Sequence, residues 1–453
     1  MKHVVIIGNG ISGITAARHI RKRSDHQITV ISAETDHFFS RTALMYIYMG
    51  HMKYEHTKPY EDQFWKKNRI DLVRDYVSDI DYANRTLKLD KGGTMSYDSL
   101  VLAVGSSPNK FGWPGQDLDG VQGLYSYQDL KLLEKNTHPP FTPASKRKVK
   151  RAVIVGGGLI GVELAEMLHT RDIPVTFLVR EARFWGNVLP KGEGDLVARH
   201  MAKHHVDLRF ETELKEILAD ENGRCRAVVT SKGEEIECQL VGLTAGVSPN
   251  VSFLKGSQLR VDRGIVVDYW LRTNQPDVYA IGDCAQFEEA LSGRRPIEQV
   301  WYTGRMMGET VARTICGEET KYQPGFWFNS AKFFDVEYQT YGTVMSNLRE
   351  GEEEFYWEHE NGEICVHLVW DKADRKFVGI NTFGIRMRHD LFDRWLREGR
   401  SVDYVLEHMR DANFDPEFYR TYERNICEVF NSQQGTDIRP LKKSWRRILN
   451  GVS

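Results

Sequence analysis

The chain has 453 residues, which is too long for one compact core and predicts two or three domains. Its 61 basic and 63 acidic residues give a formal net charge of -2, so no global electrostatic field favours nucleic acid or a strongly acidic substrate.

The six cysteines are far apart in the sequence and form no CxxC pair. This spacing favours reduced thiols in a reducing compartment over a disulfide framework or a zinc site. The first residues, MKHVVIIGNG, contain too short an apolar run for a signal peptide, and no later stretch approaches the length of a membrane span. We therefore expect a soluble cytoplasmic protein.

The first motif is a glycine loop between a predicted strand and a predicted helix, in the sequence HVVIIGNGISGITAARHI. Gly8 permits the tight turn, Gly10 lets the backbone approach a pyrophosphate, and Gly13 lets the helix pack closely on the strand. A second strand, QITVISAE, ends at Glu34, whose carboxylate can accept hydrogen bonds from ribose hydroxyls. The order of these parts predicts a dinucleotide site.

The same pattern recurs in RAVIVGGGLIGVELAEML, where Gly156, Gly158 and Gly161 form a second glycine loop before a second helix. Two such units in one chain predict two dinucleotides. The next strand, PVTFLVRE, ends in Arg180 and Glu181. Arg180 can bind a 2′-phosphate, which slightly favours NADPH as the cofactor. Glu181 would repel a 2′-phosphate, so the choice between NADH and NADPH stays open.

Three further segments predict buried strands that end in small-residue turns. Two of them are typical of places where a chain crosses between nucleotide-binding domains: YDSLVLAVGSSPN, which contains Gly105, and QLVGLTAGVSPN, which contains Gly246. The third, TNQPDVYAIGDCAQF, ends at Gly282 and Asp283.

From about residue 321 the pattern changes to strands followed by helices. The predicted strands are FWFNSAKFFDVEYQTYGTVM, EEFYWEH, EICVHLVW and KFVGINTFG. The predicted helices are RHDLFDRWLREG, SVDYVLEHMR and DPEFYRTYERNICEVF, the last with Asp415 as its N-cap and Pro416 at its first helical position. This order predicts an α+β domain.

Together these motifs resemble the pyridine nucleotide-disulfide oxidoreductase superfamily over about residues 1–320, because five motifs occur in the family's order. The resemblance implies an α/β fold with two Rossmann-like, glutathione-reductase-like dinucleotide-binding domains and a C-terminal α+β domain. The FAD-binding domain would comprise residues 1–115 and 270–320, and the NAD(P)H-binding domain residues 116–269. Residues 321–453 would form an interface domain with a helical extension.

The resemblance assigns FAD to the first glycine loop, Glu34 and Asp283, and NAD(P)H to the second glycine loop. Gly105 and Gly246 belong to the same cofactor-binding set. Glu163, on the helix after the second loop, is similar to the family glutamate that lies beside the nicotinamide. A solvated helix glutamate is the alternative interpretation.

Residues 37–50, HFFSRTALMYIYMG, contain no cysteine where disulfide-reducing members of the family carry one over the flavin. The segment is more similar to the ferredoxin-reductase and apoptosis-inducing-factor branch, in which Arg41 would neutralise the flavin pyrophosphate. Thr42 and Ala43 replace that branch's prolines. Tyr46 stands in place of a lysine near the flavin and is a candidate catalytic residue.

The sequence IEQVWYTGRMMGETVARTI is similar to the family helix whose start borders the flavin ring. This places Glu298, Trp301 and Tyr302 near the isoalloxazine, with Glu298 as a further catalytic candidate beside Glu163 and Tyr46. Aromatic residues at helical spacing are equally typical of a core, so both interpretations of the two rings stay open.

His200 and His204 are spaced as metal ligands can be on one helix face, but no third ligand accompanies them in the sequence. We therefore expect a solvated helix and no metal site. Cys284 is expected to be a small buried side chain rather than a reactive thiol.

The sequence therefore predicts an FAD-dependent NAD(P)H oxidoreductase that passes hydride from nicotinamide to flavin and electrons to an external acceptor, such as an iron-sulfur or other redox protein. The alternatives are a dehydrogenase or oxidase acting on a small molecule such as quinone or oxygen, and a non-enzymatic redox sensor. No nucleic acid partner is expected, and the interface domain is compatible with a homodimer.

The C-terminal sequence DIRPLKKSWRRILNGVS predicts a short basic amphipathic helix over residues 438–449. Docking of its apolar face on its own domain is the favoured interpretation. Steering of an acidic electron carrier comes next, and peripheral contact with an anionic membrane is the least favoured.

Overall fold

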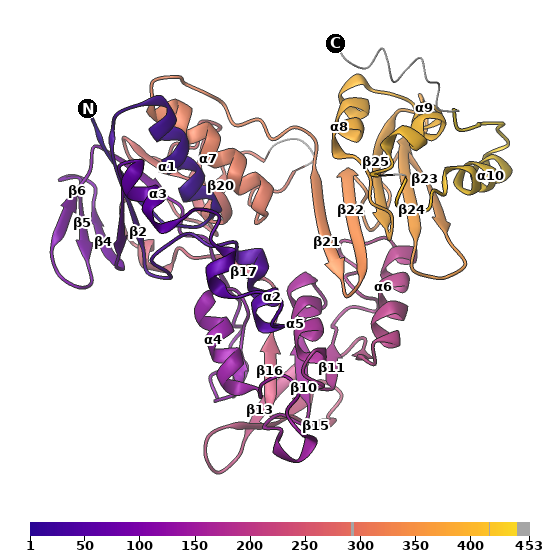
Figure 1. Ribbon diagram of the computed structural model, residues 1–453, viewed down its shortest axis with the longest axis horizontal. Coiled ribbons are helices and arrows are strands. Elements are labelled where there is room, and N and C mark those ends of the chain that lie inside the picture. The colour runs from indigo at the N-terminus through magenta and orange to yellow at the C-terminus, as the bar shows by residue number, and fades with distance from the viewer. Residues whose placement is uncertain (291–293, 416, 442–453) are drawn as a thin grey trace. The chain divides into compact units, whose positions relative to one another are not determined.

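The computed structural model describes residues 1–290, 294–415 and 417–441 (Figure 1). Within these residues the chain forms two compact units. The first unit comprises Met1–Arg180 and Val206–Pro324, and the second comprises Glu181–His205 and the described part of Gly325–Ser453.

A parallel sheet forms the first half of the first unit, in the strand order β19-β7-β1-β2-β3. Its central strands are short and almost wholly buried, as continuous β-branched sequences such as HVVII predict. The strands are β1 His3–Ile7, β2 Gln27–Ser32, β3 Ile70–Arg74, β7 Ser99–Leu102 and β19 Val278–Ala280. The helices of this half are α1 Ile11–Arg23, α2 Leu44–Tyr48, α3 Asp62–Lys67 and α7 Trp301–Ile315.

Helices α1 and α7 pack closely because small residues line their contact. A Cβ atom on Gly308 would lie 2.5 Å from the carbonyl oxygen of Ser12, so no larger residue fits there without a shift. This half also contains an antiparallel sheet of β4 Val77–Asp81, β5 Thr86–Leu89 and β6 Thr94–Ser96. It further contains a parallel pair of strands, β18 Ile265–Val267 and β20 Ala285–Phe287.

A second parallel sheet has the order β12-β11-β10-β16-β9. Its strands are β9 Val121–Gln122, β10 Ala152–Val155, β11 Val175–Leu178, β12 Asp207–Arg209 and β16 Leu240–Leu243, with helices α4 Tyr127–Asn136 and α5 Leu159–His169. An antiparallel sheet of β13 Leu214–Ala219, β14 Cys225–Thr230 and β15 Glu235–Glu237 completes this half. The two parallel sheets confirm the predicted Rossmann-like α/β class.

Strand β8, Ser106–Pro108, pairs in antiparallel fashion with β17, Val247–Pro249. These strands directly follow the turns at Gly105 and Gly246, one from each half, so the pair joins the halves where the sequence predicted a crossing.

The second unit is an antiparallel sheet in the order β21-β22-β25-β24-β23, with helices on it. Its core gathers aromatic side chains such as Trp370, Phe392 and Phe430, all fully buried. The elements are α6 Lys191–Lys203, β21 Phe328–Phe333, β22 Val336–Gly342, β23 Glu352–Glu358, β24 Cys365–Asp371, β25 Phe377–Phe383, α8 His389–Glu398, α9 Val402–His408 and α10 Glu423–Gln434.

Helix α6 is held to this sheet by a buried polar group. The Glu193 carboxylate is fully buried and accepts hydrogen bonds from Asn381 Nδ2 at 3.1 and 2.9 Å, while His367 Nδ1 lies 2.9 Å from its Oε1. Burial alone would lower the pKa of His367, but Glu193 and Glu354 raise it to about 9. The imidazole is therefore a cation that compensates the buried carboxylate.

The last described helix begins later than predicted. Asp415 adopts a left-handed conformation, with a φ of 44°, rather than the extended backbone of an N-cap, and Pro416 lies outside the described residues. The helix α10 begins at Glu423, from which point Ile426, Cys427 and Phe430 face the core. The predicted start at Asp415 is wrong because burial, rather than the local cap signal, sets where this helix begins.

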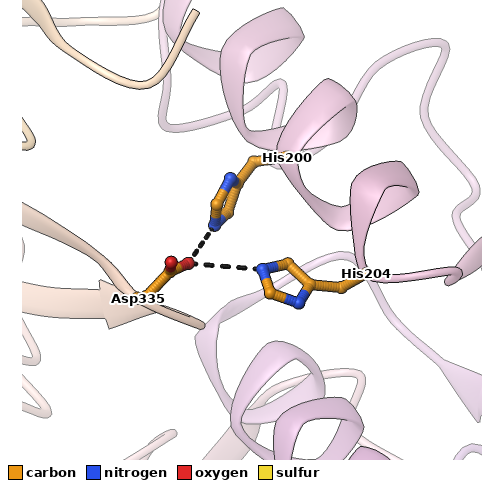
Figure 2. A group of neighbouring side chains, drawn as sticks. All are labelled: His200, His204 and Asp335. Atoms are coloured by element: carbon orange, nitrogen blue, oxygen red, sulfur yellow. Dashed lines mark hydrogen bonds and ion pairs between the residues drawn. The ribbon is translucent and has the colours of Figure 1, made fainter. Parts of the chain in front are cut away.

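The expectation of a solvated helix face at His200 and His204 is also wrong. His200 is 2% exposed, and its Nε2 lies 2.6 Å from Asp335 Oδ1. The Nε2 atom of His204 lies 3.3 Å from the same oxygen (Figure 2). Asp335 lies in the turn between β21 and β22, and the local sequence around α6 could not reveal it.

Most of the predicted basic amphipathic helix falls on residues 442–453, including Trp445, Ile448 and Leu449, which lie outside the described residues. Its described beginning packs on the second unit, because Ile438 is buried in that core and the Leu441 N–H donates to the Glu407 carbonyl oxygen at 2.8 Å. In the described part of the chain, no helix is long and apolar enough to cross a membrane.

Candidate functional site

A cavity of about 580 Å³ lies in the first unit and is lined from both of its halves. The first glycine loop, the end of β2, the segment around Arg41 and the turn at Asp283 supply one part of the lining. Helix α5 and the loop that begins with β17 supply another part, through Ile160, Glu163, Val247 and Asn250. The two glycine-loop units therefore share one cavity.

The first glycine loop has the geometry that a bound pyrophosphate needs. Gly8 has a φ of +113°, and a Cβ there would lie 2.1 Å from the Ala103 carbonyl oxygen, so only glycine fits. A Cβ on Gly13 would lie 2.1 Å from the Gly8 carbonyl oxygen. Gly10 has open space around it and precedes helix α1, so the free N–H groups at the helix start face the cavity.

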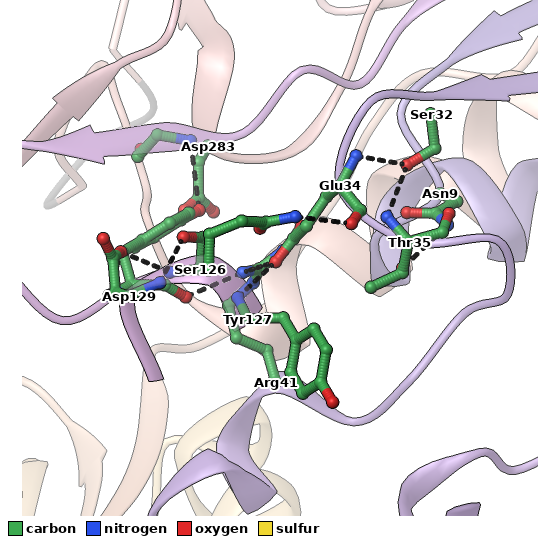
Figure 3. A network of polar contacts seen from close by, with 12 residues as sticks. Asn9, Ser32, Glu34, Thr35, Arg41, Ser126, Tyr127, Asp129 and Asp283 are labelled. Atoms are coloured by element: carbon green, nitrogen blue, oxygen red, sulfur yellow. Dashed lines mark hydrogen bonds and ion pairs between the residues drawn. The ribbon is translucent and has the colours of Figure 1, made fainter. Parts of the chain in front are cut away.

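Glu34 and Arg41 form a two-point ion pair on the wall of this cavity (Figure 3). Arg41 Nη1 and Nη2 donate to the two oxygens of Glu34 at 2.8 and 2.6 Å, and the Tyr127 N–H donates to Glu34 Oε1 at 2.9 Å. Arg41 also donates to the Tyr125 carbonyl oxygen at 2.7 Å. Oε1 accepts two of these hydrogen bonds and Oε2 accepts one, so Oε2 keeps a lone pair for a ribose hydroxyl and the residues fit the adenosine part of FAD.

Asp283 follows β19 and lines the cavity opposite this ion pair. Its Oδ2 accepts a hydrogen bond from the Tyr125 hydroxyl at 3.0 Å, and that hydroxyl oxygen accepts from the Ser106 N–H at 3.0 Å. Burial raises the pKa of Asp283, and burial followed by the charge of Asp283 raises the pKa of Tyr125. The sequence analysis missed Tyr125, because a lone tyrosine in a loop carries no pattern.

The second glycine loop repeats the geometry of the first. Gly156 has a φ of +115°, and a Cβ there would lie 2.7 Å from the Thr244 carbonyl oxygen. A Cβ on Gly161 would lie 2.5 Å from the ring of Phe177, whereas Gly158 has open space before α5. These residues fit the pyrophosphate of a second dinucleotide.

Glu163 projects from the first turns of α5 into the shared cavity. Burial, and then the negative charge of Glu166, raise its pKa from 4.5 to about 7. A carboxyl group that changes charge near neutral pH, at the place where the two dinucleotide sites meet, is the kind of group that functional sites contain.

Seven of the predicted site residues line the cavity together: Gly8, Gly10, Glu34, Arg41, Gly105, Glu163 and Asp283. Trp301, at the start of α7, is also on the lining. The other predicted residues lie off it: Gly13, Tyr46, Gly156, Gly158, Gly161, Arg180, Glu181, Gly246, Glu298 and Tyr302.

Two catalytic candidates, Glu298 and Tyr46, do not line the cavity. Glu298 is 4% exposed and forms a buried ion pair with Arg294, which gives its carboxylate a packing role. Tyr46 stacks on His51 with ring centroids 6.1 Å apart, because the short helix α2 turns Leu44 and Met45 to the cavity instead.

The cavity and its two glycine loops define a class of flavoprotein oxidoreductase that uses a nicotinamide cofactor. The model of the pyridine nucleotide-disulphide oxidoreductase family matches residues 2–308. The chain belongs to this family, and its cofactors are FAD and NAD(P)H.

Several curated relatives are similar to this chain in sequence. A rubredoxin-NAD(+) reductase of Acinetobacter baylyi is 29% identical over 71% of this chain and 80% of its own length. An NADH oxidase of Methanocaldococcus jannaschii is 28% identical over 74% of each. A nitrite reductase of Bacillus subtilis is 27% identical over 72% of this chain, which spans 38% of that relative.

Among solved structures, a ferredoxin reductase from Rhodopseudomonas palustris is similar with a TM-score of 0.75 and 22% sequence identity. The match covers 94% of this chain and 99% of that one. This likeness establishes the fold.

Proposed function

We propose that the protein carries electrons from NAD(P)H through FAD to an external one-electron acceptor, an iron-sulfur or other small redox protein. The observation that carries this proposal is the cavity lining, in which no described residue is a cysteine. Thr42, Leu44 and Met45 line the cavity from the segment where a redox thiol would stand. Electrons therefore have no thiol relay on that wall and must leave from the flavin directly.

Cys284 does not supply a relay either. It is fully buried, and its thiol lies within hydrogen-bonding distance of the Leu102 and Ile281 carbonyl oxygens, at 3.4 and 3.3 Å. Burial raises its pKa to about 12, so the thiol stays protonated at neutral pH and is a poor nucleophile. The name of the Acinetobacter relative, a rubredoxin-NAD(+) reductase, supports the same kind of acceptor.

Within this proposal, the chain's own residues bind and align the two cofactors. Residues 1–115 and 270–320 hold FAD, with Glu34 on the ribose, Arg41 on the pyrophosphate and Asp283 on the ribityl chain. Residues 116–269 hold NAD(P)H, with Glu163 beside the nicotinamide. Bound flavin accepts two electrons as hydride and can release them singly, which suits a one-electron partner. Orientation in one shared cavity supplies most of the rate enhancement.

A second candidate is oxidase activity on a small molecule. The observation in its favour is the similarity to the NADH oxidase of Methanocaldococcus jannaschii. Both functions use the same hydride step and differ in what reoxidises the flavin.

The test is stopped-flow reduction of the holoprotein by NADH or NADPH, followed by mixing with a ferredoxin, a rubredoxin, a quinone or oxygen. We expect reoxidation to be fastest with one of the two redox proteins, and to slow with rising salt because docking is electrostatic. Faster reoxidation by oxygen or quinone would support the second candidate. Slow reoxidation by every acceptor would contradict both and favour a redox sensor.

Arg180 provides the test of nicotinamide choice. It is exposed two residues after the end of β11, at the place where a 2′-phosphate would lie, and is followed by Glu181. We expect Arg180→Ala to lower the ratio of kcat/KM for NADPH to that for NADH by roughly tenfold, the worth of one charge-assisted hydrogen bond. The measurement is steady-state reduction of a dye acceptor with each nucleotide. An unchanged ratio would show that the predicted slight preference for NADPH is wrong. Arg183→Ala is the control.

A further inference from the structure

The second unit contains a group of side chains that the oxidoreductase reaction does not use. Three side chains each offer one ligand atom, and these atoms lie within 4.8 Å of one another. They are His200 in the last turn of α6, His204 at the C-cap of that helix, and Asp335 in the turn between β21 and β22. Figure 2 shows both imidazoles directed at the same carboxylate. We infer that these three side chains form a binding site for a divalent transition metal ion of the zinc type.

The donor set suits such an ion. Two imidazole nitrogens and one carboxylate oxygen are common zinc ligands, and a fourth position remains for water. Bonds of about 2.0–2.1 Å in a tetrahedral site place neighbouring ligand atoms roughly 3.3 Å apart. The Nε2 of His204 is 3.3 Å from Asp335 Oδ1, and that of His200 is 2.6 Å from it. Closing the set around an ion therefore requires Asp335 to move away from His200 and the two imidazoles to approach each other from the present spread of up to 4.8 Å.

Asp335 can make this shift because its side chain is 73% exposed, whereas His200 is held in the interior. A site with one mobile outer ligand and a fixed inner one has an entry path from solvent.

The backbone around Asp335 gives separate support. Phe333 pairs with Val336, so Phe334 and Asp335 form a two-residue hairpin turn. Phe334 has a φ of 57°, a conformation that normally requires glycine in such turns and that strains a bulky residue. Its ring stacks on His204 with centroids 4.3 Å apart and an interplanar angle of 11°. The strained residue thus orients one ligand and precedes another, as strain at a functional site does.

A proton is the competing occupant of the same place. With no metal ion, an imidazolium can pair with Asp335 and satisfy the geometry. The two occupants respond differently to pH, because metal binding requires neutral imidazoles and therefore competes with protons.

The experiment counts bound metal on the FAD-loaded protein. The full chain is treated with a chelator, desalted and dialysed against Zn²⁺ at pH 7.5 and pH 5.5, and zinc per FAD is measured by elemental analysis. We expect one zinc per chain at the higher pH and a loss of binding at the lower pH. We also expect Zn²⁺ to raise the Tm at the higher pH, because it binds only the folded chain.

The matched variants are Asp335→Asn and His205→Asn. Asp335→Asn alters an exposed ligand with little risk to folding and should weaken zinc binding by at least about tenfold. His205 is the next residue after His204, is exposed and lies outside the group. Asparagine tolerates the positive φ of 60° at this position. His205→Asn should therefore bind zinc as the wild type does. Wild-type protein without zinc, or equal zinc content in Asp335→Asn and wild type, would overturn the inference in favour of a proton-linked pair.

Discussion

Replacing Asp283 with alanine is expected to yield soluble protein that has lost its FAD. Asp283 is a half-buried acceptor on the cavity wall, and in the proposed placement of FAD its loss would leave the ribityl hydroxyls without that partner. The same change removes the acceptor of the Tyr125 hydroxyl, 3.0 Å away. Leaving buried donors unpaired costs about 1–3 kcal/mol, so FAD affinity should fall roughly ten- to a hundredfold. The ratio of flavin to protein absorbance after desalting measures it.

Two further variants separate this effect from general damage. Asp283→Asn keeps an acceptor oxygen in the same place and should retain more FAD than the alanine variant. Asp117→Ala removes a carboxylate that is 73% exposed and should leave the FAD content unchanged. A fully yellow Asp283→Ala protein would count against the placement of FAD in this cavity.

Glu163→Gln is expected to stabilise the protein above neutral pH. Because the pKa of Glu163 is raised from 4.5 to about 7, the folded state holds a proton that the unfolded state releases between those values. The contribution of this group to the free energy of unfolding is therefore largest below pH 4.5 and is lost as the pH rises through 7. A pKa difference of about 2.5 corresponds to a loss of roughly 3 kcal/mol in the free energy of unfolding of the wild type. The variant avoids this loss because glutamine carries no charge.

The measurement is the Tm of the variant minus that of the wild type at several values between pH 5 and pH 8. The difference should be smallest at pH 5, grow between pH 5 and pH 7 and level off by pH 8. In a Glu166→Gln background, where a neighbouring negative charge is removed, the difference caused by Glu163→Gln should be smaller and should level off at lower pH. A difference that stays constant with pH would show that Glu163 does not titrate near 7. Flavin reduction by NADH should likewise lose its pH dependence near 7 in Glu163→Gln.

The parts of the site that the sequence predicted are those that a parallel sheet fixes locally. Gly8, Glu34 and Asp283 each follow a buried strand, and the carboxyl ends of parallel strands meet at one edge. Strand sequence and loop position therefore suffice to place them together on the cavity. The second glycine loop follows the same rule.

The parts that the sequence did not predict depend on packing between distant segments. Asp335 contacts His200 although 135 positions separate them in the sequence, and neither local sequence indicates which residue the other contacts. The resemblance to the family names Tyr46 and Glu298, but the contacts of Tyr46 with His51 and of Glu298 with Arg294 could not be read from the sequence. Periodicity shows which face of a helix is apolar and not which remote side chain covers it.

The path of the chain through α6 limits how the protein can be divided. The backbone passes between the two units at residues 180–181, 205–206 and 324–325, so a single protease cut cannot release two intact pieces. A gene fragment ending at residue 324 would still encode α6 but not the strands beneath it. Glu193 would then lose Asn381 and His367, and Leu196 and Val197 would be exposed to water. An expression vector for the nucleotide-binding unit must therefore replace residues 181–205 with a linker long enough to return from the end of β11 to the start of β12, because these strands pair in parallel.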